Sequence, residues 1–239
     1  MIAKHLKLLL VLAAAVLLVI GSVVYNEWKA AAAHARTDAN WSLIVPAISA
    51  SDHTIGNVDA PIQVIVYADY QCAFCGRFFR DTQFRLQEEF GDKIVIAYRH
   101  LPIINSEKSA VEAEASECVY QLGGNEAFWR FTRAMFADPD SQKSFDVSTL
   151  PEIAVSAGVE RSDYEECMAE GRGKDPVERD LMQGSIAGLN LTPSIVLKSQ
   201  YRALIVKGDY PLQLSAGISY LLKTNKEIEG TAAPESMVK

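Results

Sequence analysis

The chain is poor in cysteine and histidine and carries no excess of positive charge. Its 239 residues include 4 Cys, 4 His, 23 Lys+Arg and 30 Asp+Glu, which gives a formal net charge of −7. A protein that binds a nucleic-acid backbone needs a basic surface, so this balance argues against a nucleic-acid partner. Four cysteines are too few for a disulfide-rich scaffold, and the length fits one globular domain with an appendage. The sequence also lacks a phosphate-binding loop, a serine triad and an internal repeat.

One long apolar run stands near the start of the chain. Lys4 and Lys7 precede residues 8–24, a stretch without a charged side chain. As a helix this stretch spans about 25 Å, close to the thickness of a bilayer core. The preceding lysines predict an N-terminus inside the cytoplasmic membrane and the remainder outside. We therefore expect residues 1–28 to be a single-pass membrane anchor; the alternative is a cleaved signal segment and a secreted protein.

The rest of the chain divides into segments with different sequence patterns. Residues 29–55 are alanine-rich and then polar, and we expect a spacer there. Runs rich in β-branched residues at 62–68 and 93–99 flank a helical pattern, which predicts a βαβ unit. Strand patterns return at 194–197 and 204–207.

Between the two pairs of strands the sequence is helical. The helical patterns cover residues 106–122, 126–137, 149–157, 162–170 and 176–189, and a closing helix is expected at 211–224. The predicted domain therefore runs over residues 56–226, as a βαβ half, an inserted α-helical block at about 103–189 and a ββα half. Residues 227–239 are expected to form a frayed tail.

Two of the cysteines are separated by two residues. Cys72 and Cys75 follow the first strand pattern and open a helix, where the unpaired N–H groups stabilise a thiolate. We expect Cys72 to face solvent with a lowered pKa and to act as the nucleophile, and Cys75 to be buried and to resolve the mixed disulfide. Half of a zinc site would need a second ligand pair, which the sequence lacks, so we expect redox chemistry without a metal or cofactor. A plain structural disulfide within the motif is a further alternative.

The other two cysteines fall on separate predicted helices. A bridge between Cys118 and Cys167 would pin two helices of the inserted block, and we interpret the pair as structural. The alternative is a second redox pair that relays electrons. The dipeptide Thr192-Pro193 stands just before a strand, and by itself such a proline is usually a turn residue.

Taken together, the order of the elements resembles the thioredoxin fold with a helical insertion, as in DsbA-like thiol:disulfide oxidoreductases of the membrane-anchored bacterial group. Four local strings carry the resemblance: Gly56–Pro61, Asp69–Cys75, Tyr98–Pro102 and Leu191–Ser194. The resemblance implies that Cys72 exchanges with the substrate, that Cys75 resolves, and that Pro193 is a cis proline facing the disulfide. It places Thr192, Pro193 and Phe74 in the substrate groove, and some members carry a structural bridge placed like the one between Cys118 and Cys167.

The chain departs from the family at two positions. Many relatives have a buried carboxylate six residues before the first active cysteine, where this sequence has Val66, and Asp69 is the candidate proton relay that remains. The residue before Cys75 is Phe74 instead of the histidine of the strongest oxidants, so we expect a smaller lowering of the Cys72 pKa. The redox potential is expected between the oxidising and reducing extremes.

The resulting hypothesis is an extracytoplasmic oxidoreductase that oxidises cysteine pairs. Its expected partners are exported proteins with free cysteines and a membrane thiol oxidase that reoxidises the site. A reductase or isomerase would use the same residues in the other direction. A non-catalytic scaffold that binds partners at the Pro193 groove is the distant alternative.

Overall fold

The computed structural model describes residues 21–22, 44–137 and 146–231. Apart from Gly21 and Ser22, the anchor expected at residues 1–28 lies outside these ranges, as does most of the expected C-terminal tail. Among the described residues, no helix combines the length and the apolar character that crossing a membrane requires. The account below concerns the compact unit that begins at Thr37.

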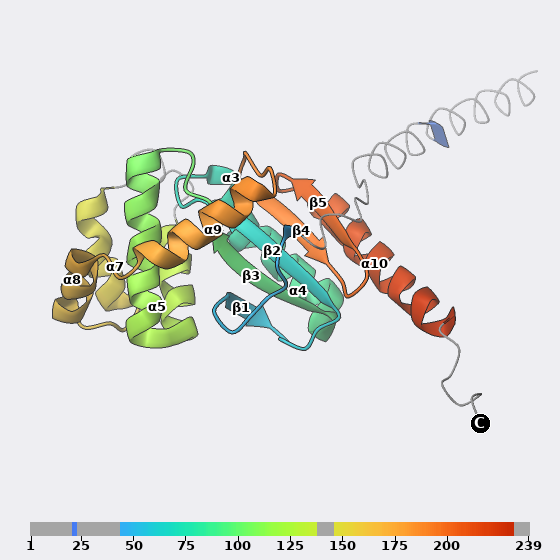
Figure 1. Ribbon diagram of the computed structural model, residues 1–239, viewed down its shortest axis with the longest axis horizontal. Coiled ribbons are helices and arrows are strands. Elements are labelled where there is room, and N and C mark those ends of the chain that lie inside the picture. The colour runs from blue at the N-terminus through green and yellow to red at the C-terminus, as the bar shows by residue number, and fades with distance from the viewer. Residues whose placement is uncertain (1–20, 23–43, 138–145, 232–239) are drawn as a thin grey trace, which may run out of the picture. The chain divides into compact units, whose positions relative to one another are not determined.

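A five-stranded sheet forms the centre of this unit (Figure 1). The strand order is β1-β3-β2-β4-β5. The strands are β1 (His53–Gly56), β2 (Ile62–Ala68), β3 (Ile94–His100), β4 (Ser194–Lys198) and β5 (Ala203–Lys207). β2 and β3 are parallel, while β1 pairs antiparallel with β3 and both β4 pairings are antiparallel. The parallel pair is the βαβ half and the β4–β5 hairpin belongs to the ββα half, which confirms the predicted fold.

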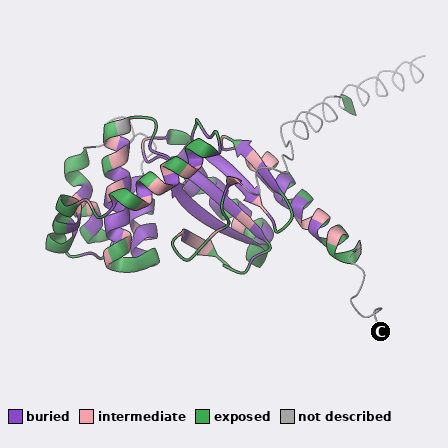
Figure 2. Cartoon of the chain, viewed as in Figure 1, coloured by how far each residue is buried: buried purple, intermediate pink, exposed green. Residues whose placement is uncertain are grey.

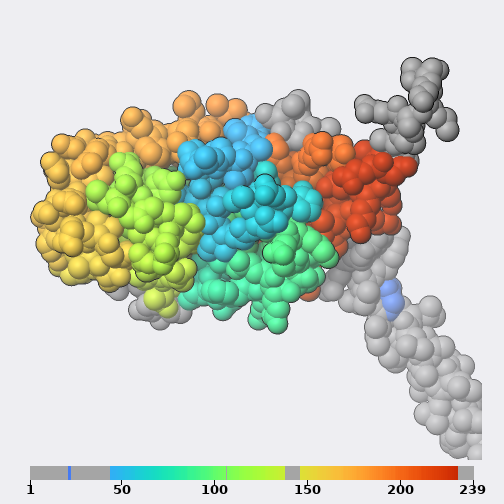
Figure 3. Space-filling view, turned by 90° about the horizontal axis from the view of Figure 1, so that it is seen from below, coloured from blue at the N-terminus to red at the C-terminus, as the bar shows by residue number. Residues whose placement is uncertain are grey.

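Helices connect and cover the strands. In chain order they are α3 (Ala73–Arg77), the π-helical turn η1 (Phe78–Thr82), α4 (Gln83–Phe90), η2 (Gly91–Lys93), α5 (Ser106–Met135), η3 (Val147–Thr149), α7 (Leu150–Ser156), α8 (Arg161–Glu170), α9 (Lys174–Ile186) and α10 (Pro211–Thr231). In the space-filling view α7 and α8 lie at the end of the domain opposite α10 (Figure 3). Helices α7 and α8 of the inserted block therefore extend the domain away from α10.

The sheet is buried on both faces, as its apolar strands require (Figure 2). One face packs against α3, η1, α4, α5 and α10; its strand residues include Val64, Val66 and Tyr98. The other face carries Ile65 and Tyr67 and packs against residues at the end of α9 and against Val45. Because β2 alternates between these two cores, every one of its side chains except Gln63 is buried.

One expectation needs correction, and another is confirmed. The second half of the expected spacer, residues 29–55, contributes to the domain: His53–Gly56 is an edge strand, and Val45 is fully buried. This edge strand is only four residues long, too short for a clear alternation of apolar and polar side chains. The two helices expected at 106–122 and 126–137 are confirmed: they are the two parts of α5, separated by a non-helical backbone at Gly124 (φ 72°) that glycine adopts at no steric cost.

Candidate active site

The CxxC cysteines lie where β2 gives way to α3. Cys72 is the N-cap residue of α3, with an extended backbone, and Cys75 lies in the first turn. The backbone N–H of Gly76 donates to the Cys72 carbonyl at 3.1 Å, and the Cys72 N–H donates to the carbonyl of Asp69 at 3.0 Å. The first cysteine is therefore held at the positive end of the helix by the backbone on both sides of it.

Both cysteines are present as free thiols, and both are largely buried. Cys75 has no exposed surface, while Cys72 is 5% exposed. The expectation that Cys72 faces solvent is thus wrong in degree, because the loop containing Thr192 covers it. The side chain that projects outward is that of Phe74, which is 58% exposed.

The two thiols have opposite pKa shifts. A hydrogen bond from Cys75 lowers the pKa of Cys72 to about 6, helped by Thr192 and by the N–H groups of Cys75 and Phe74, although burial opposes the shift. Burial raises the pKa of Cys75 well above its usual value, and the adjacent Cys72 raises it further. Phe74 in place of histidine therefore does not prevent a strong lowering, since the donors are the second thiol and the helix N-terminus.

A loop from the distant end of the chain completes the site. The Thr192-Pro193 peptide bond is cis. The Cys72 Sγ donates to the Thr192 carbonyl at 3.2 Å, across 120 positions of the sequence. The loop is fixed by Gly208, whose N–H donates to the Pro193 carbonyl at 2.8 Å, and by Ser194, whose hydroxyl donates to the Leu191 carbonyl at 2.7 Å. Cys72, Thr192 and Pro193 thus meet in one place.

Asp69 joins the loops that follow β2 and β3. Its Oδ1 accepts the N–H of Gln71, and its Oδ2 accepts the N–H groups of Ile103 and Ile104, each at 2.8 Å. Both carboxylate oxygens are therefore engaged by the backbone. The role of proton relay that the sequence suggested for Asp69 stays a prediction, and these bonds leave the residue little freedom to perform it.

Charged groups anchor the active helix from the other side. The Nε of Arg77 donates to Asp209 Oδ2 at 2.5 Å, and the hydroxyl of Thr82 donates to Asp209 Oδ1 at 2.8 Å. Asp209 is buried and lies between β5 and α10. These contacts tie α3 and η1 to the segment between β5 and α10.

A second carboxyl lies behind the motif. Glu112 of α5 is fully buried, and one of its oxygens accepts a hydrogen bond from the side chain of Gln71, the residue before Cys72. Burial raises the pKa of Glu112 to about 7. The sequence analysis missed Glu112, because a single glutamate in a helix carries no sign that it will be buried.

A buried trio outside the active site was also missed. His53 of β1 and His100 of β3 each place Nε2 near the same Oε1 of Glu117, at 2.7 and 3.0 Å. Two imidazoles and a carboxylate are possible metal ligands. However, a ligand histidine is normally oriented by a partner on its other nitrogen, and neither Nδ1 has one among the described residues. The geometry fits a hydrogen-bonded trio that ties β1 to α5.

The remaining cysteines are joined to each other. Cys118 of α5 and Cys167 of α8 form a disulfide with a Cα–Cα distance of 5.8 Å. Both residues are fully buried. The bond connects two helices of the inserted block.

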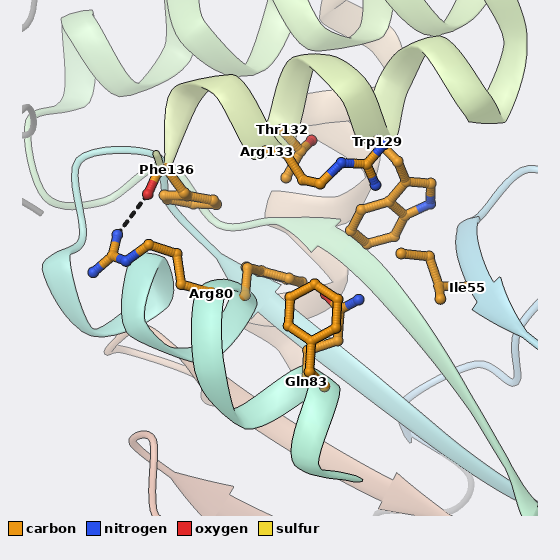
Figure 4. A pocket seen from close by; sticks show the side chains of 9 residues that line it. Ile55, Arg80, Gln83, Trp129, Thr132, Arg133 and Phe136 are labelled. Carbon is orange, nitrogen blue, oxygen red and sulfur yellow. Dashed lines mark hydrogen bonds between the residues drawn. The ribbon is translucent and has the colours of Figure 1, made fainter. Parts of the chain in front are cut away.

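A cavity of about 220 Å³ opens beside η1 and α5 (Figure 4). Its inner wall consists of the buried aromatic rings of Phe79, Trp129 and Phe136 and the buried Thr132. Arg80 also lines it and donates to the Phe136 carbonyl at 2.6 Å. The cavity thus reaches from the surface to the aromatic core that packs beneath the active helix.

Known proteins share this architecture. A family model described as Thioredoxin matches residues 49–204. The crystal structure of oxidised BdbD from Bacillus subtilis superposes with a TM-score of 0.66, at 22% identity, over 75% of this chain and 96% of that one. Wolbachia pipientis alpha-DsbA1 gives a TM-score of 0.64, at 21% identity, over 79% of this chain and 98% of that one.

The curated relatives are longer proteins, and this chain matches only part of each. The Na(+)/H(+) antiporter NhaA 1 of Mycobacterium sp. (strain KMS) is 26% identical over 160 residues, which are 66% of this chain and 25% of the antiporter. The chain therefore spans about a quarter of the length of such relatives. The family model covers well over half of the chain, so the chain belongs to the thioredoxin family, and the superpositions show that it has the fold of DsbA-type thiol:disulfide oxidoreductases.

Proposed function

We propose that the protein is an extracytoplasmic thiol:disulfide oxidoreductase that oxidises cysteine pairs in exported proteins. The observation that carries this proposal is the contrast between the two thiols: Cys72, with a pKa of about 6, lies beside Cys75, whose pKa is raised. A thiol with a low pKa is a good leaving group and stabilises the reduced form, which favours oxidation of the substrate. A reductase would not benefit from that stabilisation.

The reaction uses each residue in a defined role. A substrate thiolate attacks Cys72 Sγ, the Cys72–Cys75 bond breaks, and its electron pair stays on Cys75. A second substrate thiolate then attacks the substrate sulfur of the mixed disulfide and releases Cys72 as a thiolate. The substrate loses two electrons, and a disulfide-bearing membrane oxidase takes them up when it reoxidises the pair.

The cis-proline loop supports substrate binding. Pro193 and Thr192 lie against Cys72, and the exposed ring of Phe74 borders the same place. An extended substrate segment can hydrogen-bond to the backbone before Pro193 while its cysteine reaches the sulfur of Cys72. In this proposal an N-terminal anchor at residues 1–28 holds the domain at the outer side of the membrane.

Two cysteine variants test the proposal. The full chain with Cys75→Ser is expected to trap exported clients as mixed disulfides through Cys72, whereas Cys72→Ser traps none and abolishes oxidation of a reduced client. Non-reducing gel electrophoresis with mass spectrometry detects the trapped species. Continued oxidation by the Cys72→Ser variant would refute a redox role, and an empty trap with Cys75→Ser would favour the scaffold alternative.

A further inference from the structure

Disulfide exchange at this site requires the buried Cys75 to gain a proton in one direction and to lose it in the other. This inference rests on the proposed function. When Cys72 is attacked, Cys75 leaves as a thiolate and must gain a proton; when the pair is reoxidised, Cys75 must lose one before its sulfur attacks Cys72. Cys75 has no exposed surface, so water cannot serve it directly. A group inside the protein has to help.

Tyr98 of β3 has a buried hydroxyl group that the active site described above does not use. The residue is 1% exposed, and its hydroxyl makes no hydrogen bond of good geometry among the residues that the structure describes, although the Tyr70 side chain lies close enough to affect its pKa. A buried hydroxyl without a partner is costly, and natural proteins retain few of them. Burial raises the pKa of Tyr98 well above its usual value, and Tyr70, Cys75 and Asp69 raise it further. The phenol therefore stays neutral and keeps a proton to donate.

The fold places the ring of Tyr98 in the same core cluster as the resolving thiol. Phe79, four residues after Cys75 in the continuous α3–η1 helix, stacks on the ring of Tyr98 at 5.3 Å between centroids. Positions four residues apart share a helix face, so Cys75 faces the same strand. On β2 the register partner of Tyr98 is Val66, an apolar side chain that can neither donate nor accept a proton.

Hydroxyl groups continue from Tyr98 towards solvent. The ring of Tyr70 stacks on that of Tyr98 at 5.5 Å, and the Tyr70 hydroxyl shares a hydrogen bond with Thr132 at 2.8 Å. Thr132 in turn lines the cavity beside η1 (Figure 4). The stacked rings and the Tyr70–Thr132 hydrogen bond thus lead from Tyr98 to the cavity without involving Asp69, whose two oxygens accept backbone N–H groups.

We propose that the Tyr98 hydroxyl helps Cys75 to gain and lose its proton. Its hydroxyl donates to the Cys75 sulfur as the thiolate forms, and Tyr70 and Thr132 connect it to water in the cavity. In the dithiol form Cys75 keeps its proton, so its sulfur does not yet attract the Tyr98 hydroxyl as a thiolate would.

The test is the Tyr98→Phe variant of the full chain, which keeps the ring and loses the hydroxyl. The reduced protein is mixed with oxidised glutathione, quenched in acid at successive times, and analysed by mass spectrometry for the Cys72–glutathione mixed disulfide. We expect the mixed disulfide to form at the wild-type rate and to be resolved on the order of 100-fold more slowly. The resolution rate of the variant should rise about tenfold per pH unit over a wider pH range than that of the wild type, because without the donor the Cys75 thiolate is less stabilised and forms only at higher pH.

The matched control is Tyr164→Phe, which removes the hydroxyl of a buried tyrosine in α8. It should leave the resolution rate and its pH dependence unchanged. Thermal unfolding should show no loss of stability in Tyr98→Phe, since the deleted hydroxyl has no partner in the described residues. Resolution at the wild-type rate in Tyr98→Phe, or an equal slowing in Tyr164→Phe, overturns this inference alone. A wild-type chain that forms no mixed disulfide overturns it together with the proposed function.

Discussion

Titration of Cys72 offers a quantitative check on the active site. Its pKa is lowered from 9.0 to about 6, chiefly by the hydrogen bond from Cys75. At 1.36 kcal/mol per unit, the thiolate stabilises the reduced protein by about 4 kcal/mol at high pH. Because the folded pKa is depressed, this contribution is complete above the unfolded value and is lost as the pH falls through about 6. At pH 7 about 1.4 kcal/mol remains, equivalent to about 30 mV in a two-electron potential.

The expected result is a change in the redox equilibrium with pH. Equilibration with glutathione should show the pair becoming more oxidising, relative to an unperturbed dithiol, as the pH rises above 6. Thiolate absorbance and the rate of alkylation should both give a midpoint near 6 for the reduced wild type. The reasoning fails if that midpoint lies above about 8, close to an ordinary cysteine.

Two variants at Cys75 distinguish which group lowers the pKa of Cys72. Cys75→Ser keeps a hydroxyl donor beside Cys72, whereas Cys75→Ala removes the donor and retains the burial. We expect the midpoint of Cys72 to stay within about one unit of the wild type in the serine variant and to rise by more than that in the alanine variant. Equal midpoints in the two variants would show that the helix N-terminus, and not Cys75, sets the pKa.

Two further predictions concern stability. The double variant Cys118→Ala with Cys167→Ala opens a loop with a sequence separation of 49 and should lower the free energy of unfolding in urea by about 4 kcal/mol, without changing the glutathione equilibrium of the active pair. An altered glutathione equilibrium would instead assign these cysteines to electron relay. The pKa of Glu112 is raised from 4.5 to about 7, so the folded state keeps the Glu112 proton to a higher pH than the unfolded state does. The free energy of unfolding of the oxidised chain should therefore fall by about 3 kcal/mol between pH 4.5 and 7. In urea titrations Glu112→Gln should abolish this loss, and an unchanged pH profile would contradict the assignment.

The sequence predicted those parts of the fold that have local signals. β2 was expected at residues 62–68 and occupies Ile62–Ala68, because Pro61 and a β-branched run mark it. The spacing of Cys72 and Cys75 likewise identified the start of the active helix. Such features depend on neighbours in the chain, so pattern and propensity are sufficient to find them.

Features that depend on distant pairing were missed. His53 and Glu117 are 64 positions apart, and only the packing of α5 against the edge of the sheet makes them partners. The exposure of Cys72 was overestimated for the same reason, since the loop that covers it lies 120 positions away. Burial of polar groups is a tertiary property, and composition or periodicity gives no measure of it.

The placement of the structural disulfide separates two kinds of sulfur chemistry within one molecule. Cys118 and Cys167 are sealed in the helical block with no exposed surface, whereas Cys72 keeps 5% of its surface exposed at the start of α3, beyond the end of the central strand β2. Thiolates can attack only a sulfur that they can reach, so a client bound at the active pair has no access to the structural bond. The enzyme can therefore work among reactive thiols without scrambling its own covalent framework.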